Sequence, residues 1–177
     1  RPTFGRISTA GILPISSHFD TVGIFARHPD LIAQILDVYG MKEQSEVTRL
    51  RIIPSLVDRL ENSLKSPFLE KLNSMRSLVS SVSHFDIDEN QLIEWSSVVR
   101  TIGMYDLWQV HKEWIMRSNP TFGQIIKERI QLARSITYED YKLALEKKEA
   151  IRRFMEENLE PSDVLVFPTV HDVPPLL

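Results

Sequence analysis

Apolar residues recur at intervals of three and four positions in several parts of the chain, and this spacing predicts amphipathic helices. Start signals support the assignments: Pro29 suits a first helical position, Asp88 suits an N-cap, and Thr137 with Asp140 has the spacing of a capping box. The predicted helices cover residues 29–40, 88–117, 124–134 and 137–159. Between Leu56 and Ser81 the spacing is poorer, and Ser66-Pro67 predicts one broken helix or two short ones.

Short apolar runs between these helices predict strands. RLRII at 49–53 is stopped by Pro54, and a second run covers 82–87. DVLVF at 163–167 is continuously apolar, as expected of a strand buried on both faces of a parallel sheet. Residues 1–27 are punctuated by Gly and Pro, so we expect short strands such as GILPI and TVGIFAR joined by loops. The predicted class is therefore α/β, with helices packed on a mixed, largely parallel sheet that includes these early strands.

Composition narrows the function. The 177 residues are 42% hydrophobic and 25% charged, with a net charge of −3. Basic and acidic residues are interspersed, which disfavours nucleic-acid binding. No apolar run approaches the roughly 20 residues of a membrane span, and we expect no membrane association. The absence of cysteine fits a reducing compartment, so the expected location is cytoplasmic.

Few residues have the spacing of a known reactive site. No two of the five histidines lie three or four positions apart on a helix, so we predict no metal site, and no glycine-rich loop indicates a cofactor. Ser16, Ser17 and His18 suggest a nucleophile with a base. Neighbours in sequence rarely have the geometry of a proton relay, however, and no G-x-S-x-G turn is present. We therefore predict no catalytic residue in this chain.

Three segments carry a family resemblance. They are the opening RPTFGRISTAGILPISSHFDTVGIFARHPD, the stretch HKEWIMRSNPTFGQIIKERI at 111–130, and the ending DVLVFPTVHDVPPL. In this order they resemble the amidase signature family, and their motifs are similar to those of its indoleacetamide-type members. The region from Met41 to Gln109 matches the family only in the order of its predicted helices and strands. One departure is His171-Asp172, where the family commonly has small residues beside the pocket.

The resemblance implies a Ser-Ser-Lys amidase that hydrolyses a carboxylic amide to an acid and ammonia or an amine. In that family the nucleophile, the bridging Ser and the Lys lie upstream of the opening motif. Residues 1–177 would then be the C-terminal portion of a single amidase domain, inactive alone. The implied partners are the N-terminal part of the same amidase and a small-molecule amide, and a homo-oligomer stays open. The alternative is a non-catalytic helical interaction or scaffold domain.

The resemblance also implies roles for individual residues. Ser17, Asp20, Thr21 and Gly23 would pack behind the nucleophile loop; alternatively, Asp20 caps a turn and Gly23 supplies a backbone angle. Arg129 would bind a substrate carboxylate, as an Arg at this place does in the glutamine-handling amidotransferase branch; alternatively, it is a solvated helix residue. Trp114 and Thr169 would contribute to substrate binding, with Trp114 otherwise a core residue.

Overall fold

The computed structural model describes residues 3–41 and 46–173. The chain divides into two compact units. Unit 1 comprises Arg1–Lys42 and Trp95–Arg153, and unit 2 comprises Glu43–Glu94 and Phe154–Leu177. Arg1, Pro2 and the Pro-Pro pair of the ending motif lie outside the described residues.

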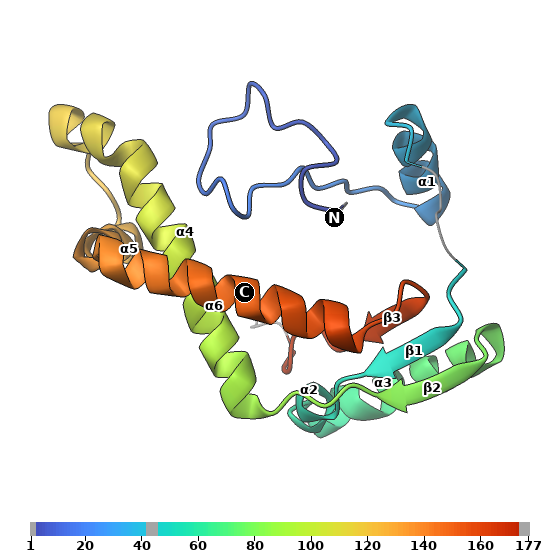
Figure 1. The fold of residues 1–177 in the computed structure, drawn as a ribbon. Helices are drawn as coiled ribbons and strands as arrows, with labels where there is room; N and C mark the ends of the chain where they lie inside the picture. Colours follow the sequence, from blue (N-terminus) through green and yellow to red (C-terminus); the bar gives the residue numbers. More distant parts are fainter. Residues whose placement is uncertain (1–2, 42–45, 174–177) are drawn as a thin grey trace. The chain divides into compact units, whose positions relative to one another are not determined.

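Unit 2 is built on a three-stranded parallel sheet in the order β2-β1-β3 (Figure 1). Its strands are β1 (Arg49–Ile52), β2 (Ser81–His84) and β3 (Asp163–Val166). The connection from β1 to β2 contains α2 (Pro54–Asp58), α3 (Asn62–Met75) and the 3-10 helix η1 (Arg76–Leu78). Leu50 and Ile52 of β1 form the core with Val57, Leu60 and Leu72. This βαβ arrangement confirms the predicted α/β class.

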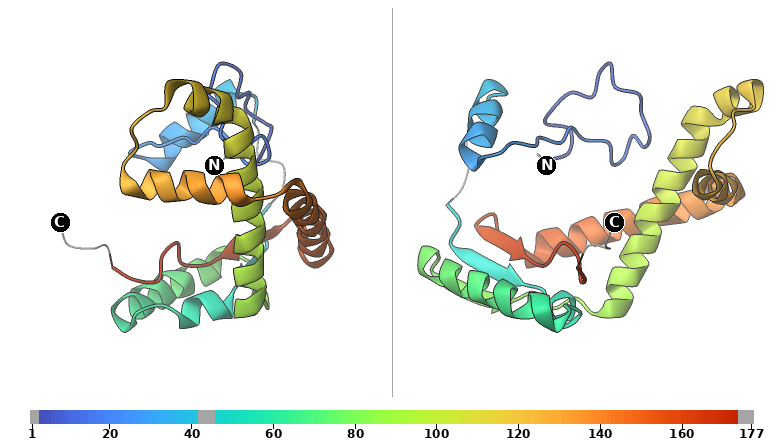
Figure 2. Two further views of the ribbon diagram at one scale, coloured as in Figure 1. Left: turned by 90° about the vertical axis from the view of Figure 1, so that its left-hand side faces the viewer. Right: turned by 180° about the vertical axis from the view of Figure 1, so that it is seen from behind.

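Unit 1 is helical. It contains α1 (Pro29–Val38), α5 (Gln124–Ser135) and most of α4 (Glu89–Ser118) and α6 (Tyr138–Asn158). α4 and α6 cross each other (Figure 2), and Val98, Ile102 and Ala144 of these helices form a buried core. Both predicted capping signals are present. The Oδ1 of Asp88 accepts from the Gln91 N–H at 2.9 Å, and Thr137 exchanges hydrogen bonds with Asp140.

The predicted early strands are wrong. From Thr3 to Arg27 the described chain contains turns and irregular backbone but no strand. Its N–H groups bond locally, for example from Ile12 to the carbonyl of Thr9 at 3.1 Å. Gly5 and Gly11 take left-handed φ values of +79° and +82°, which reverse the chain and prevent an extended run. Both edges of β1 are occupied by β2 and β3, so the central strand offers no free edge for pairing.

Two further expectations need correction. The helical break in 56–81 falls around Leu60 and Glu61, and α3 continues through Pro67. The Glu61 N–H, just before α3, bonds to the His171 carbonyl at 3.0 Å, a tertiary contact that fixes where the helix begins. β3, an outer strand of the described sheet, is not buried on both faces, since Val164 is 37% exposed.

Among the helices that the structure describes, none has the length and apolarity needed to cross a membrane.

Candidate functional site

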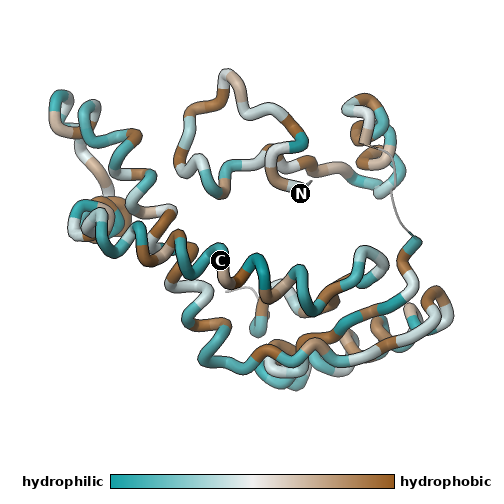
Figure 3. Tube along the Cα trace, viewed as in Figure 1, coloured by the Kyte–Doolittle hydropathy of each residue, from teal (hydrophilic) through white to brown (hydrophobic). Residues whose placement is uncertain are grey.

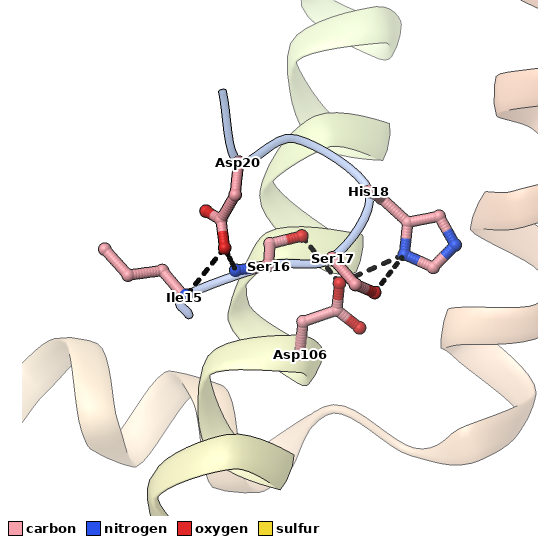
Figure 4. A network of polar contacts seen from close by, with 6 residues as sticks. All are labelled: Ile15, Ser16, Ser17, His18, Asp20 and Asp106. Atoms are coloured by element: carbon pink, nitrogen blue, oxygen red, sulfur yellow. Dashed lines mark hydrogen bonds and ion pairs between the residues drawn. The ribbon is translucent and has the colours of Figure 1, made fainter. Parts of the chain in front are cut away.

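The most extensive buried polar network of unit 1 joins the N-terminal segment to α4 (Figure 4). Asp106 lies on α4 in line with the core residues Val98 and Ile102, one helical turn after Ile102, and is 8% exposed. Its Oδ2 accepts a 2.6 Å hydrogen bond from Ser16 Oγ, and Nδ1 of His18 lies 3.1 Å from the same oxygen. The carboxylate thus binds two side chains of a segment about 90 residues away in sequence.

The segment held by Asp106 is a tight turn. The carbonyl of Ser16 accepts from the N–H groups of Phe19 and Asp20. The Asp20 carboxylate accepts in return from the N–H groups of Ile15, at 2.8 Å, and Ser16, at 3.0 Å. The predicted alternative that Asp20 caps a turn is therefore confirmed. Nearby, Nε2 of His111 on α4 lies 3.2 Å from the Pro14 carbonyl oxygen, which adds a second link between the helix and this segment.

Aromatic side chains surround the buried carboxylate. The ring of Tyr141 on α6 lies edge-on to His18 at 6.0 Å and stacks on Tyr105 at 4.2 Å. Burial, followed by the negative charge of Asp106 and a hydrogen bond to it, raises the pKa of Tyr141. A raised phenol pKa keeps Tyr141 in its neutral form.

The arrangement does not constitute a Ser-His-Asp relay. A relay needs one imidazole nitrogen toward the serine and the other toward the carboxylate. Here Ser17 Oγ, at 3.5 Å, and Asp106 Oδ2 both face Nδ1 of His18. Ser16 is bonded to Asp106 itself and is buried. The network therefore positions a turn and has no activated nucleophile.

A pocket of about 360 Å³ lies within the N-terminal segment of unit 1. Ser17 and Asp20, two of the residues expected to pack behind a nucleophile loop, lie in its wall. The other lining residues are Phe4, Gly5, Ile7, Ser8, Thr9, Ala10 and Pro14. Thr21 and Gly23 follow the turn, Thr21 half-buried and Gly23 exposed. Gly23 has no positive φ, so the alternative that it supplies a special backbone angle is wrong.

None of the residues expected to bind substrate is among those that line this pocket. Arg129 is exposed on α5. Trp114 is half-exposed on α4 and contacts the rings of His111 and Phe122 edge-on; within the described residues no hydrogen bond or ring contact links it to Arg129. Thr169 is exposed in unit 2, after β3. Across residues 3–41 and 46–173, no group of three or more His, Cys, Asp or Glu side chains is arranged to hold a metal ion.

Sequence reasoning missed Asp106. The apolar positions that predict this helix include Ile102, which the structure buries together with Val98 and Asp106, whereas Val99 and Trp114, also among them, are exposed. One signal was available, since a carboxylate four residues after Ile102 falls on the stripe that includes Ile102. A charge on a buried stripe requires a hydrogen-bond partner.

The chain was compared with protein-family models and with known proteins. No protein-family model matches the chain. The chain is 29% identical along its whole length to a protein named Amidase 1 from Arabidopsis thaliana, of which it spans 49%. It is 23% identical, again along its whole length, to the translocon at the outer membrane of chloroplasts 64 from Pisum sativum, of which it spans 35%. The chain therefore spans half or less of the length of these relatives.

A solved structure described as an amidase has the same fold. It superimposes on 99% of this chain with a TM-score of 0.83 at 22% sequence identity, and the match covers 41% of that structure. The fold likeness extends over both units, including the N-terminal segment without strands.

Proposed function

We propose that the chain belongs to the amidase signature family and forms the C-terminal part of a hydrolase acting on a carboxylic amide. The observation that carries the proposal is the similarity to Amidase 1 along the whole chain. The products would be a carboxylic acid and ammonia or an amine. The Ser-Ser-Lys residues would lie in a part of the protein that precedes Arg1.

In this proposal the turn held by Asp106 supports the catalytic loop. Ser17 and Asp20 line the pocket of unit 1, and the pocket would receive the loop that carries the nucleophile. Because Ser16 is bonded to a buried carboxylate, the turn is rigid enough to serve as a backing surface. Thr21 and Gly23 would continue that surface. The chain itself supplies support and no reacting atom.

Arg129, Trp114 and Thr169 would contact the substrate. Arg129 and Thr169 are exposed, so a ligand has access to both side chains. A guanidinium suits a carboxylate on the substrate, because its planar fork donates two parallel hydrogen bonds. Trp114 is 44% exposed, and this part of its side chain would be open to an apolar group.

The partner of this chain would be the remainder of the amidase. α1 has no buried residue, and its exposed apolar side chains include Leu31, Ile35 and Val38. Hydrophobic positions along this helix are coloured brown in Figure 3. An amphipathic helix with an uncovered apolar face is typical of a surface that packs against another segment. We propose that the N-terminal part of the amidase covers it. Cytoplasmic location and a homo-oligomer stay predictions.

One observation favours a second candidate. A relative similar along the whole chain bears a name that describes a translocon of the chloroplast outer membrane and no enzyme. A non-catalytic interaction or scaffold role therefore remains the rival function. The residues that precede Arg1 would distinguish the hydrolase from the scaffold, because only the hydrolase requires Ser, Ser and Lys there.

The test uses protein expressed from the complete reading frame that contains this chain. We expect ammonia release from small amides such as indole-3-acetamide, and labelling by a fluorophosphonate at a serine outside residues 1–177. Absence of both would support the scaffold role. Labelling at Ser16 or Ser17 would contradict the assignment of catalysis to another part of the protein.

A further inference from the structure

The two faces of the sheet in unit 2 differ in chemistry. Leu50 and Ile52 of β1 point into the core, so Arg49 and Arg51, which alternate with them, lie on the opposite face. Register places Ser83 of β2 beside Arg51. Faces of parallel sheets are ordinarily apolar, since both are usually covered by other elements. Although Leu165 of β3 also lies beside Arg51, the arginines and Ser83 on this face require polar partners.

Arg49 and Asp163 show how this face binds a carboxylate. Nε and Nη2 of Arg49 donate to the two oxygens of Asp163 at 2.5 and 2.8 Å, the side-on fork of a guanidinium. The Asp163 side chain is 1% exposed. Glu160 adds a further negative charge near Arg49. The charge of Arg49 is thus compensated.

Arg51 lacks an equivalent partner. Its Nη1 lies 3.6 Å from Asp163 Oδ2, and its guanidinium lies over the ring of Phe85 at 5.3 Å. These contacts leave the other edge, Nε with Nη2, without a hydrogen bond to any described residue. Nε is buried, while the Arg51 side chain as a whole is 18% exposed. The fork that Arg49 uses is therefore vacant on Arg51.

Ser83 supplies a second donor beside this fork. Its Oγ is buried and has no hydrogen-bond partner within the described ranges. Buried polar groups nearly always have partners, and two orphans at paired positions of neighbouring strands call for a common acceptor. A carboxylate fits both, because its two oxygens accept from a fork and from a hydroxyl together.

We propose that Arg51 and Ser83 form a carboxylate-binding site on the polar face of the sheet in unit 2. The carboxylate belongs either to a small-molecule acid or to an Asp or Glu side chain from elsewhere in the complete protein. Arg51 binds it through Nε and Nη2, and Ser83 donates through Oγ. The site does not depend on the proposed hydrolase activity.

The test follows the Nε–H resonance of Arg51 by NMR in protein from the complete reading frame, with acetate as the probe. Acetate replaces chloride at constant ionic strength. A free site gives a saturable shift of this resonance and a rise in melting temperature with acetate. An internal Asp or Glu gives an Nε–H that is protected from exchange with water before acetate is added and does not respond to it.

Substitutions at Arg51 and Ser83 test whether these two residues form the site. Arg51→Lys should abolish the acetate response, since an ammonium has no fork. Ser83→Ala should weaken acetate binding about 5- to 10-fold, the loss expected for one hydrogen bond. Arg59→Lys is the matched control, because Arg59 pairs with Glu89 at the surface of the same unit. The proposal is wrong if the wild-type Nε–H exchanges rapidly and shows no saturable shift at about 100 mM acetate.

Discussion

The turn in unit 1 offers a direct measure of what Asp106 contributes, because two adjacent serines differ only in their surroundings. Ser16 is buried and its hydroxyl donates to the carboxylate at 2.6 Å. Ser17 is exposed, and its hydroxyl lies at the limit of hydrogen bonding, 3.5 Å from His18. Ser16→Ala removes one hydroxyl and leaves untouched the backbone bonds of the turn to Asp20. Ser17→Ala is the matched control.

The expected loss follows from the charge of the acceptor. A hydrogen bond to a charged group contributes about 1.5–3 kcal/mol, so Ser16→Ala should lower the free energy of unfolding of unit 1 by that amount. For a protein of this size the change corresponds to a fall in melting temperature of about 3–12 °C. Ser17→Ala should stay within about 0.5 kcal/mol of wild type, as exposed substitutions do.

Urea unfolding followed by tryptophan fluorescence provides the assay, since all three tryptophans of this chain, at 95, 108 and 114, lie in unit 1. A double-mutant cycle with Asp106→Asn isolates the pair. Its coupling energy should approach the cost of Ser16→Ala alone. Equal losses for the two serine variants, or a coupling energy near zero, would refute the assignment of Asp106 as the anchor of the turn.

Three more outcomes are expected. The hydrogen bond from Arg49, followed by backbone bonding and the charges of both arginines, holds the pKa of Asp163 below its ordinary value of 3.8 despite burial. The resulting stability is present above about pH 4 and is lost as pH falls through the folded-state pKa of Asp163. The melting temperature of the wild type should therefore drop in acid, and that of Asp163→Asn should drop by a smaller amount. Asp58→Asn, at the surface, should behave as the wild type does. Arg129→Ala should lower kcat/KM of the complete enzyme by a factor that corresponds to roughly 2–4 kcal/mol of activation free energy, without changing its melting temperature. Arg129→Lys should recover little of this loss, and Lys127→Ala should have no effect. A parallel loss of stability would assign Arg129 to the scaffold. The 177-residue chain alone should neither hydrolyse amides nor react with fluorophosphonates, and stoichiometric labelling of the chain would contradict this.

Local signals account for what the sequence predicted correctly. Asp88 and Thr137 mark helix starts because capping is completed within three residues, as the bonds from the Gln91 N–H to Asp88 and from the Asp140 N–H to Thr137 show. β1 was recognisable from RLRII and the proline after it. The same logic fails for α3, whose start depends on the carbonyl of His171, about 110 residues further along the chain.

The polar clusters of both units were invisible for a related reason. Asp106 looks like a solvated helix residue until Ser16 and His18 are brought to it, and Arg51 looks like an exposed strand residue until Ser83 and Asp163 are placed beside it. Hydrophobic periodicity records only which face of an element is buried. It contains no information on which side chains of separate segments meet.

This difference also separates the two kinds of functional statement that the chain supports. The similarity to amidases rests on many residues at once, so it is unaffected by errors made for individual elements, such as the strands expected before Arg27. A residue's role rests on two or three contacts of one side chain, and apolar spacing does not reveal a buried polar residue such as Asp106, even where it includes a neighbour on the same face, here Ile102. Experiments on this chain therefore discriminate best when they alter one buried polar group and keep its exposed neighbour as control. Ser16 with Ser17, and Arg51 with Arg59, are such pairs.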